Sequence, residues 1–344
     1  MSRTAVVICP GRGTYNKPEH GYLQRHHAAK SELFERFDNL RKDADHPAIT
    51  ALDSEVPFSA RSHTQGDVAS PLIYAASFSD ALNISDDIEI VGVTGNSMGW
   101  YIALAVAGAL SAADGFRVVN TMGTLMQAQS IGGQLIYPFT GDNWVSDPAA
   151  KQVILDVVRE IDARADHVLA LSIDLGGMLV LAGDEAGLSA FETQMPQVQG
   201  RYPMRLPNHS AFHTHLQDPI AALGCEALSA DMFTQPNIPM IDGRGAIWWP
   251  NSSDLSALYD YTFSHQVTEP YDFTKAIQTA AQEFAPDMFI ITGPGNTLGG
   301  AVAQSLILAD WQGMRSKADF LKEQENDPIL VSMGLDAQRA LAES

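Results

Sequence analysis

The stretch VGVTGNSMGWYIALAVAG, residues 91–108, places Ser97 between two glycines, after an apolar run and before an apolar, helix-like segment. Gly95, Ser97 and Gly99 fit the pattern G-x-S-x-G, in which a strand turns sharply into a helix. The turn needs small flanking residues, because a Cβ there would collide with the adjacent backbone. We therefore predict that Ser97 is a nucleophile and that the backbone N–H of Met98, at the helix start, stabilises an oxyanion. The alternative is an ordinary glycine-flanked turn.

Two other apolar runs end in glycine turns in the same way, at residues 4–13 and 285–295. Three such units with helical stretches between them predict an α/β fold with a parallel sheet. The pattern changes between residues 135 and 205, where two strands around a Gly-Gly turn precede a helix and a further strand. We predict a large α/β domain of residues 1–134 and 206–344, with an inserted α+β subdomain of residues 135–205.

Composition narrows the possible functions. The chain of 344 residues is 45% apolar, enough for a large core, and its net charge of −20 argues against a nucleic-acid partner. No apolar run is long enough for a membrane span or a secretory signal, which predicts a cytoplasmic protein.

Two cysteines, outside any Cys/His cluster, predict buried free thiols and no metal site. Residues 40–72 are interpreted as loops and short elements on the surface, and residues 316–325 as a polar helix.

A serine hydroxyl needs a base to attack a carbonyl group at neutral pH. The segment LPNHSAFHTHLQDP, residues 206–219, holds three of the ten histidines. Spacing alone leaves open whether His213 is that base or a surface-loop histidine.

Four motifs together resemble the malonyl-CoA:acyl-carrier-protein transacylases and the acyltransferase domains of polyketide and fatty acid synthases. They follow the family's order and span nearly the whole chain: CPGRG (9–13), GNSMGWY (95–101), LPNHSAFHTHL (206–216) and GPGNTLGG (293–300). The resemblance implies an α/β-hydrolase-like parallel-sheet body, a small ferredoxin-like subdomain and a cleft between them. The resemblance also implies that the last motif, GPGNTLGG, is a structural turn.

The resemblance also implies roles for individual residues. Ser97 corresponds to the acyl-accepting nucleophile, His213 to its base and Gln266 to the glutamine whose carbonyl orients that histidine. The backbone N–H groups of Met98 and Arg12 correspond to the oxyanion hole. A helix-capping role is the alternative for Gln266, and His209 and His215 fall outside the motif position.

One departure concerns the acyl group. Met122, in MGTLMQ, stands where malonyl-using members carry an arginine that pairs with the substrate carboxylate. A thioether cannot neutralise a carboxylate, so the sequence favours an apolar acyl group over malonyl. The alternative is that Arg12, which replaces the family's glutamine, binds the carboxylate; it could instead pair with a protein acid or a CoA phosphate.

Two departures flank the nucleophile. Asn96 replaces a histidine and Trp100 replaces a glutamate, and both are candidates for the substrate-binding wall. A large ring at position 100 is consistent with a more apolar acyl pocket, and core packing is the alternative.

The resulting hypothesis is acyl transfer from acyl-CoA to an acyl carrier protein through a Ser97 acyl-enzyme, in fatty acid or polyketide biosynthesis. Thioester chemistry of this kind requires no metal or organic cofactor. An acyl hydrolase that clears carrier proteins and a non-catalytic scaffold subunit are the alternatives. Since carrier proteins are acidic, Arg201 and Arg205 are candidates for a docking patch.

Overall fold

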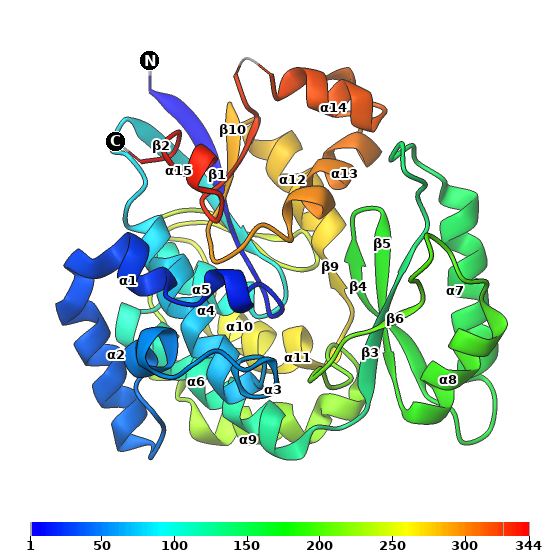
Figure 1. Ribbon diagram of the computed structural model, residues 1–344, viewed down its shortest axis with the longest axis horizontal. Coiled ribbons are helices and arrows are strands. Elements are labelled where there is room, and N and C mark those ends of the chain that lie inside the picture. Colours follow the sequence, from blue (N-terminus) through cyan, green and yellow to red (C-terminus); the bar gives the residue numbers. More distant parts are fainter. Residues whose placement is uncertain (1, 326, 344) are drawn as a thin grey trace.

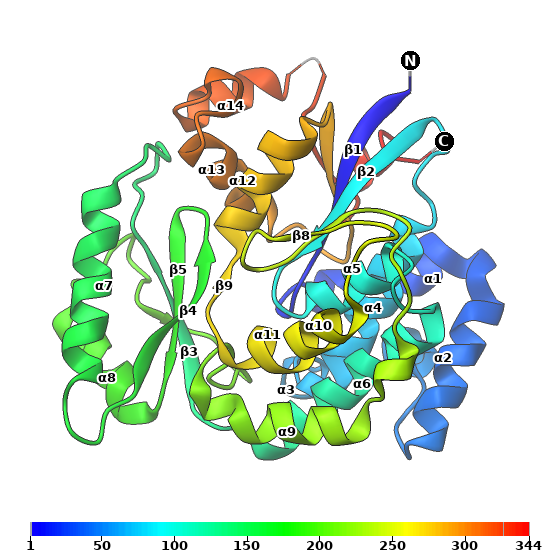
Figure 2. The same ribbon diagram turned by 180° about the vertical axis from the view of Figure 1, so that it is seen from behind.

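The computed structural model describes residues 2–325 and 327–343 and contains two β-sheets with helices packed around them (Figures 1 and 2). The six-stranded sheet has the order β11-β10-β1-β2-β7-β8 and the five-stranded sheet the order β6-β3-β5-β4-β9. The strands of the first sheet are β1 (Arg3–Cys9), β2 (Ile88–Gly95), β7 (Met240–Ile241), β8 (Ile247–Trp248), β10 (Met288–Ile291) and β11 (Leu330–Ser332). Those of the second are β3 (Gly133–Pro138), β4 (Leu169–Leu175), β5 (Met178–Gly183), β6 (Met204–Arg205) and β9 (Tyr271–Asp272).

Fifteen labelled α-helices lie in the described residues and cover both sheets. They are α1 (Tyr22–His27), α2 (Ser31–Asp43), α3 (Ala60–His63), α4 (Gly66–Ala81), α5 (Gly99–Val106), α6 (Ala112–Gln129), α7 (Pro148–Asp162), α8 (Glu185–Gln194), α9 (Asp218–Ala227), α10 (Leu255–Asp260), α11 (Gln266–Thr268), α12 (Phe273–Phe284), α13 (Gly299–Leu308), α14 (Lys317–Glu323) and α15 (Asp336–Arg339). No helix among the described residues is both long enough and apolar enough to cross a lipid bilayer.

The six-stranded sheet is the predicted parallel body. Each neighbouring pair from β11 to β7 is parallel, and only the edge strand β8 runs antiparallel. Residues 5–9 of β1 are fully buried, as expected for a strand covered on both faces. Cys9 pairs with Gly95 and Ile8 with Ile291, so the carboxyl ends of β1, β2 and β10 lie side by side and the turns that follow them leave the sheet at the same end. Ligands of open parallel sheets bind at the carboxyl ends of the strands.

The five-stranded sheet contains the predicted ferredoxin-like unit. Its elements follow the order β3-α7-β4-β5-α8-β6, which is the β-α-β-β-α-β arrangement of that motif. The Gly-Gly turn between β4 and β5 and the helix α8 are found where the sequence predicts them. Residues 135, 137, 179 and 181 pack beneath α7 and α8, on the outer side of the sheet. Alternate residues 136, 173 and 180 therefore point to the opposite face, towards the body.

The prediction that residues 40–72 form loops and short elements on the surface is wrong at both ends, because residues 40–43 belong to α2 and the chain from residue 66 onward belongs to α4. Residues 66 and 68–80 of α4 are buried. An apolar helix that is covered all round lacks an amphipathic pattern, so the search for periodicity missed it. Polar helix α14 is found as predicted, and of the two free cysteines Cys9 is buried whereas Cys225 is half-buried.

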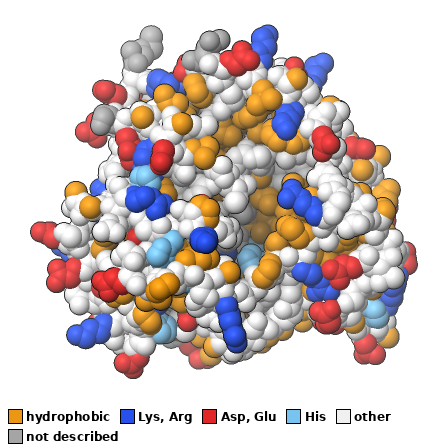
Figure 3. Space-filling view, viewed as in Figure 1, with side chains coloured by type: hydrophobic (Ala, Val, Ile, Leu, Met, Phe, Trp, Pro, Cys, Tyr) orange, Lys and Arg blue, Asp and Glu red, His pale blue; other side chains and the backbone are white. Residues whose placement is uncertain are grey.

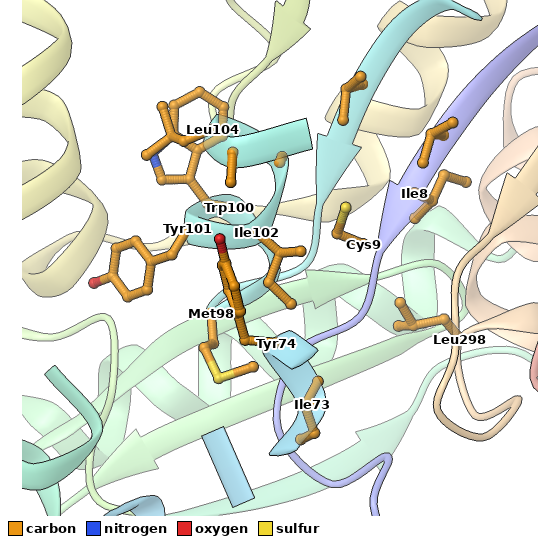
Figure 4. Packing of buried hydrophobic residues seen from close by; sticks show 14 of the residues in the cluster. Ile8, Cys9, Ile73, Tyr74, Met98, Trp100, Tyr101, Ile102, Leu104 and Leu298 are labelled. Carbon is orange, nitrogen blue, oxygen red and sulfur yellow. The ribbon is translucent and has the colours of Figure 1, made fainter. Parts of the chain in front are cut away.

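Helix α5 anchors the turn that carries Ser97. Residues 99–105 are all buried, and Figure 4 shows Ile102 of α5 on the side that faces Cys9 of β1, with Trp100 and Leu104 on the other side of the helix. The side chains of Ile73 and Tyr74 approach from α4. The helix therefore lies within the core, and its first turn is held by packing on several sides.

Candidate active site

Ser97 lies in the turn between β2 and α5, with a backbone φ of +55°. The two flanking glycines are required by close backbone approach. A Cβ on Gly95 would stand 2.2 Å from the carbonyl carbon of Gly99, and a Cβ on Gly99 would stand 2.2 Å from the carbonyl oxygen of Cys9. Since no side chain fits at either place, the glycines let the strand turn at once into the helix and hold Ser97 at the sheet edge.

His213 reaches Ser97 from the loop before α9. Its Nε2 lies 2.7 Å from Ser97 Oγ, and its Nδ1 lies 2.7 Å from the backbone carbonyl oxygen of Gln266. A carbonyl oxygen only accepts, so Nδ1 carries the hydrogen and Nε2 presents a lone pair to the serine hydroxyl. The backbone N–H of His213 donates to the Val267 carbonyl oxygen over 3.1 Å, which fixes the loop. A general base at Ser97 needs the tautomer that has its hydrogen on Nδ1 and a lone pair on Nε2.

Burial keeps His213 neutral. The side chain is 3% exposed. Desolvation lowers the pKa of His213 to about 4, although the hydrogen bond to the Gln266 carbonyl acts in the opposite direction. The imidazole is therefore unprotonated, and able to accept a proton, over the whole neutral range.

Gln266 contributes both its backbone and its side chain. Besides the carbonyl that accepts from His213, its Nε2 donates to the Ser97 carbonyl oxygen over 3.0 Å, and its Oε1 accepts from the Tyr101 hydroxyl over 3.0 Å. Gln266 thus ties the histidine loop to the turn that carries the serine. Tyr101 was not singled out from the sequence, because only the fold brings α5 beside α11.

The first turn lies against the serine turn. A Cβ on Gly11 would stand 2.5 Å from the Asn96 carbonyl oxygen, so the two loops touch through their backbones. Among the described residues, the backbone N–H groups of Arg12 and Met98 donate no hydrogen bond, and both residues line the same cavity as Ser97. Two free N–H groups at one cavity wall are what an oxyanion hole requires.

The Arg12 side chain runs between two loops. Its Nη2 donates to the carbonyl oxygens of Thr64 and Asn208, each over 2.8 Å, and its guanidinium carbon lies 5.5 Å from the Phe212 ring centroid. Burial lowers the pKa of Arg12 to about 10, while the charge of Asp67 acts to raise it. The guanidinium remains charged at neutral pH.

His209, which lies outside the family motif position, also lines the cavity. Its Nδ1 lies 2.8 Å from Gln134 Oε1, and Gln134 Nε2 donates to Ser172 Oγ over 2.7 Å, so His209 carries its hydrogen on Nδ1. Burial, with the nearby charge of Arg12, lowers the pKa of His209 to about 3. The sequence analysis assigned no role to His209 or to Asn208, which precedes it in the chain.

These groups surround a cavity of about 1120 Å³ between the two sheets. Figure 3 shows a hollow near the middle of this face, with hydrophobic side chains in its wall and Lys and Arg side chains around it. Residues Val119, Met122 and Met126 of α6 line one side, and Ile136 and Val180 of the five-stranded sheet another. The volume and apolar lining are typical of a small-molecule site.

Three predicted substrate-binding residues lie in different surroundings. Met122 lines the cavity and is 1% exposed, and Asn96 lines it with a buried Oδ1 that has no hydrogen-bond partner. Trp100 does not lie in the cavity wall. Its ring is fully buried, donates from Nε1 to Thr262 Oγ1 over 3.0 Å and packs edge-on against Tyr261. The expectation that Trp100 shapes the acyl pocket is therefore corrected to core packing, because the ring is absent from the cavity lining and its contacts are with buried side chains.

The cavity lining is more basic than the chain as a whole. Its charged residues are Arg12, Arg61, Arg201, Lys317 and a single acid, Asp142, in a chain with 41 acidic and 21 basic residues. Arg205 is not available for docking as the sequence suggested, because its Nη2 pairs with Glu185 at 3.0 Å and Glu192 at 2.8 Å. Within residues 2–325 and 327–343, no group of three His, Cys, Asp or Glu side chains could hold a metal ion.

No protein-family model matches the chain. Among curated proteins, it is 27% identical over 282 residues to a polyketide biosynthesis malonyl CoA-acyl carrier protein transacylase of Bacillus subtilis, covering 79% of this chain and 90% of that one. It is 26% identical over 313 residues to a phenolphthiocerol synthesis polyketide synthase of Mycobacterium marinum, covering 90% of this chain. The chain spans 14% of that synthase and 4% of a Streptomyces halstedii polyketide synthase, to which it is 26% identical over 230 residues, 66% of this chain.

Solved structures share the whole fold. The malonyl-CoA:acyl carrier protein transacylase of Xanthomonas oryzae superposes with a TM-score of 0.76 and 20% identity, covering 100% of this chain and 98% of that one. A malonyl-transacylase in complex with its type II polyketide synthase acyl-carrier protein gives 0.73 and 17%, covering 99% of both. This chain is therefore similar, in sequence and in fold, to the malonyl-CoA:acyl-carrier-protein transacylases and the acyltransferase domains of polyketide synthases.

Proposed function

We propose that this protein is an acyltransferase that moves an acyl group from an acyl-CoA to an acyl carrier protein through a Ser97 acyl-enzyme. The observation that carries the proposal is the 2.7 Å contact between Ser97 Oγ and a His213 Nε2 whose tautomer is fixed by the Gln266 carbonyl. The same contact argues against a non-catalytic scaffold, because a drifted site has no reason to keep this geometry.

The first half-reaction transfers the acyl group to the enzyme. His213 Nε2 takes the Ser97 hydroxyl proton as Oγ attacks the thioester carbonyl carbon. The backbone N–H groups of Arg12 and Met98 hold the oxyanion that forms. The carbon–sulfur bond then breaks, and the leaving sulfur receives the proton from His213. The product is an ester on Ser97 and free coenzyme A.

The second half-reaction reverses these steps with another thiol. The pantetheine thiol of a carrier protein gives its proton to His213, its sulfur attacks the ester carbon, and the bond to Ser97 Oγ breaks as the proton returns to the serine. Neither step needs an external oxidant, reductant or metal. Support for the acceptor comes from the similarity to a transacylase solved with its acyl-carrier protein.

The cavity supports an acyl group that is not restricted to malonyl. Met122 offers no charge on α6, and its neighbours Val119 and Met126 are also apolar. Since a carboxylate buried against this wall would lack a counter-ion, α6 cannot select it. Arg61, Arg201 and Lys317 line the cavity and form no ion pair with a carboxylate of the described residues, so they suit the phosphates of coenzyme A or an acidic carrier protein.

A two-stage assay tests the proposal and separates transfer from hydrolysis. The enzyme is first acylated with an acyl-CoA, freed of excess donor, and then incubated with or without a phosphopantetheinylated carrier protein. We expect the carrier protein to gain the acyl mass and the enzyme alone to hold its acyl group for longer than a transfer turnover. Rapid release of free acid without the carrier protein would instead identify a hydrolase. Ser97→Ala is the matched control and should transfer nothing.

A further inference from the structure

His209 lines the cavity with an imidazole that the acyl-transfer steps above do not use. One ring nitrogen, Nδ1, lies 2.8 Å from Gln134 Oε1. The other, Nε2, has no hydrogen-bond partner among the described residues, and it is not sealed off from solvent. A polar atom of the cavity lining that the protein leaves without a partner is available to a ligand.

A chain of hydrogen bonds decides which ring nitrogen of His209 carries the hydrogen. The Ser172 hydroxyl donates to the Phe212 carbonyl oxygen over 2.8 Å, and a hydroxyl has a single hydrogen to donate. Ser172 Oγ must therefore accept from Gln134 Nε2, 2.7 Å away, which turns Gln134 Oε1 towards His209. Because that amide oxygen only accepts, His209 donates through Nδ1, and Nε2 holds a lone pair.

The same chain of hydrogen bonds holds the imidazole in place. Gln134 and Ser172 are both buried and come from strands β3 and β4 of the five-stranded sheet. The Phe212 ring packs against the imidazole, with 5.8 Å between the two ring centroids. A side chain fixed by packing and by a directed hydrogen bond loses little entropy when a ligand binds, so it can impose a direction on that ligand.

His209 is neutral at neutral pH. Burial, and then the charge of Arg12, lower the pKa of His209 to about 3. Nε2 is therefore an acceptor and not a donor. A ligand atom that bonds to it must carry a hydrogen, which a hydrocarbon chain, a ketone oxygen and an ionised carboxylate cannot supply.

His209 lies where two apolar walls of the cavity meet. One wall belongs to α6 and includes Met126, and the other begins with β3 and includes Ile136. The loop of His209 is tied to the short connection between α6 and β3, because the Ala211 backbone N–H donates to the Ile131 carbonyl oxygen over 2.7 Å. An acyl chain that packs along these walls therefore passes a single directed acceptor.

We propose that His209 Nε2 accepts a hydrogen bond from a hydroxyl on the acyl chain, so that the substrates are hydroxyacyl thioesters as a class. The inference rests on the proposed function, because it concerns the acyl group that Ser97 receives. It refines the apolar acyl group that the sequence favours by one polar group. Apolar walls with one fixed acceptor suit a chain that is hydrocarbon apart from a hydroxyl.

Matched pairs of acyl-CoAs test the proposal. 3-Hydroxybutyryl-CoA is compared with butyryl-CoA, and 2-hydroxypropionyl-CoA with propionyl-CoA, and each hydroxy compound is used as separate enantiomers. The rate of Ser97 acylation, as kcat/KM, is followed by rapid quench and intact-mass spectrometry. We expect the wild type to prefer the hydroxylated member of at least one pair by about 10-fold, the effect of one neutral hydrogen bond. Because the acceptor is fixed, one enantiomer should account for most of the preference.

Two variants connect this preference to Nε2. In His209→Asn the amide nitrogen can still donate to Gln134 Oε1 from the place of Nδ1, but nothing accepts at the place of Nε2. The ratio within the pair should fall to about one. His209→Gln brings an amide oxygen close to the place of Nε2 and loses the bond to Gln134, so its ratio should be intermediate.

His215→Asn is the matched control. His215 belongs to the same loop but is exposed and lies outside the cavity lining, so this variant should keep the wild-type ratio. The ratio is used because both members of a pair share any change in the loop. Labelling of Ser97 by a fluorophosphonate checks that the serine turn and the histidine loop still assemble in each variant.

The outcomes separate the two proposals. A wild-type ratio near one in both pairs, or a preference that persists in His209→Asn, would overturn the role of His209 while leaving the acyl-enzyme intact. If that persistent preference comes with slower acylation by both members, the hydrogen bond belongs to the pantetheine arm and the hydroxyacyl class is wrong. If no acyl-CoA adds mass to Ser97 in the wild type, the proposed function fails and this inference fails with it. If His209→Asn does not fold, the wild-type ratio and its reduction in His209→Gln still decide.

Discussion

Ser97 Oγ and His213 Nε2 lie 2.7 Å apart, although 116 positions separate the two residues in the chain. Both have a left-handed backbone, with φ values of +55° and +59°. Neither is glycine, so each conformation is strained and persists only because the surroundings hold it. The glycine contacts of the serine turn and the hydrogen bonds of the histidine loop supply that restraint. Strain at two facing residues is typical of a site built for a reaction.

The His213 imidazole and the Gln266 side chain should differ in how much they contribute to acylation. His213→Ala removes the base, and we expect the rate of Ser97 acylation to fall by about 10³-fold. Gln266→Ala keeps the backbone carbonyl that accepts from Nδ1 and loses only the side-chain bonds to Ser97 and Tyr101, so its loss should stay below about 100-fold. Acylation kinetics of both variants, at equal folded fractions, provide the measurement. A larger loss in Gln266→Ala than in His213→Ala would contradict this division of roles.

The acylation rate should be insensitive to pH where an ordinary histidine titrates. Because the pKa of His213 is lowered to about 4, the base stays neutral down to that pH. We expect kcat/KM for acylation to be level between pH 7 and pH 5.5 and to fall as the pH drops through about 4. The profile is measured as kcat/KM for acylation of Ser97 by an acyl-CoA, with quenching after a few seconds and intact-mass spectrometry at each pH. A midpoint near 6.5 would show that the imidazole is solvated in the free enzyme.

The same burial makes the fold sensitive to acid. His209 and His213 stay neutral in the folded protein but bind a proton in the unfolded chain below pH 6.5. The unfolded state therefore holds more protons, and the free energy of unfolding decreases as the pH falls from about 6.5 towards 4. Each histidine contributes about 1.4 kcal/mol per pH unit within that window. Urea unfolding at pH 7, 6 and 5 measures the slope.

His209→Gln isolates one of the two contributions. Glutamine cannot be protonated, so the variant should lose stability less steeply than the wild type between pH 6 and pH 5, by about 1.4 kcal/mol per unit. Equal slopes for the two proteins would mean that His209 is accessible to solvent when folded.

The glycines of the serine turn should not tolerate alanine. In Gly95→Ala and Gly99→Ala the added methyl group meets backbone atoms at 2.2 Å, so the turn must open. We expect a loss of about 3 kcal/mol or more in the free energy of unfolding, or failure to fold. Gly300→Ala is the control, because its Cβ would meet nothing within 4 Å on helix α13. It should be neutral or stabilising by up to about 1 kcal/mol, and a similar loss at position 300 would remove the steric explanation.

Much of the architecture could be predicted from local patterns. Apolar runs that end in glycine turns identify β1, β2 and β10, since a buried parallel strand needs a continuous apolar stretch. The Gly-Gly turn identifies the β4–β5 hairpin. Helix α4 could not be found in this way, because a helix that is buried on all sides shows no polar face.

The residues of the candidate site could be predicted only where a sequence pattern shared with the family identifies them. Ser97 and His213 come from two of the motifs and Gln266 from the family resemblance, and the structure brings them within hydrogen-bond distance. Their catalytic roles stay predictions. Tyr101 and Gln134 depend on packing between distant elements, which no local pattern encodes. The positions of the Trp100 ring and the Arg12 guanidinium depend on side-chain direction, which the sequence does not reveal.

The central claim is that Ser97 accepts an acyl group. Intact-mass spectrometry after incubation with a panel of acyl-CoAs tests it most directly, using the wild type and Ser97→Ala side by side. We expect the wild type to gain the mass of one acyl group and Ser97→Ala to gain none. The same mass gain on both proteins, or none on the wild type with any member of the panel, would contradict the account.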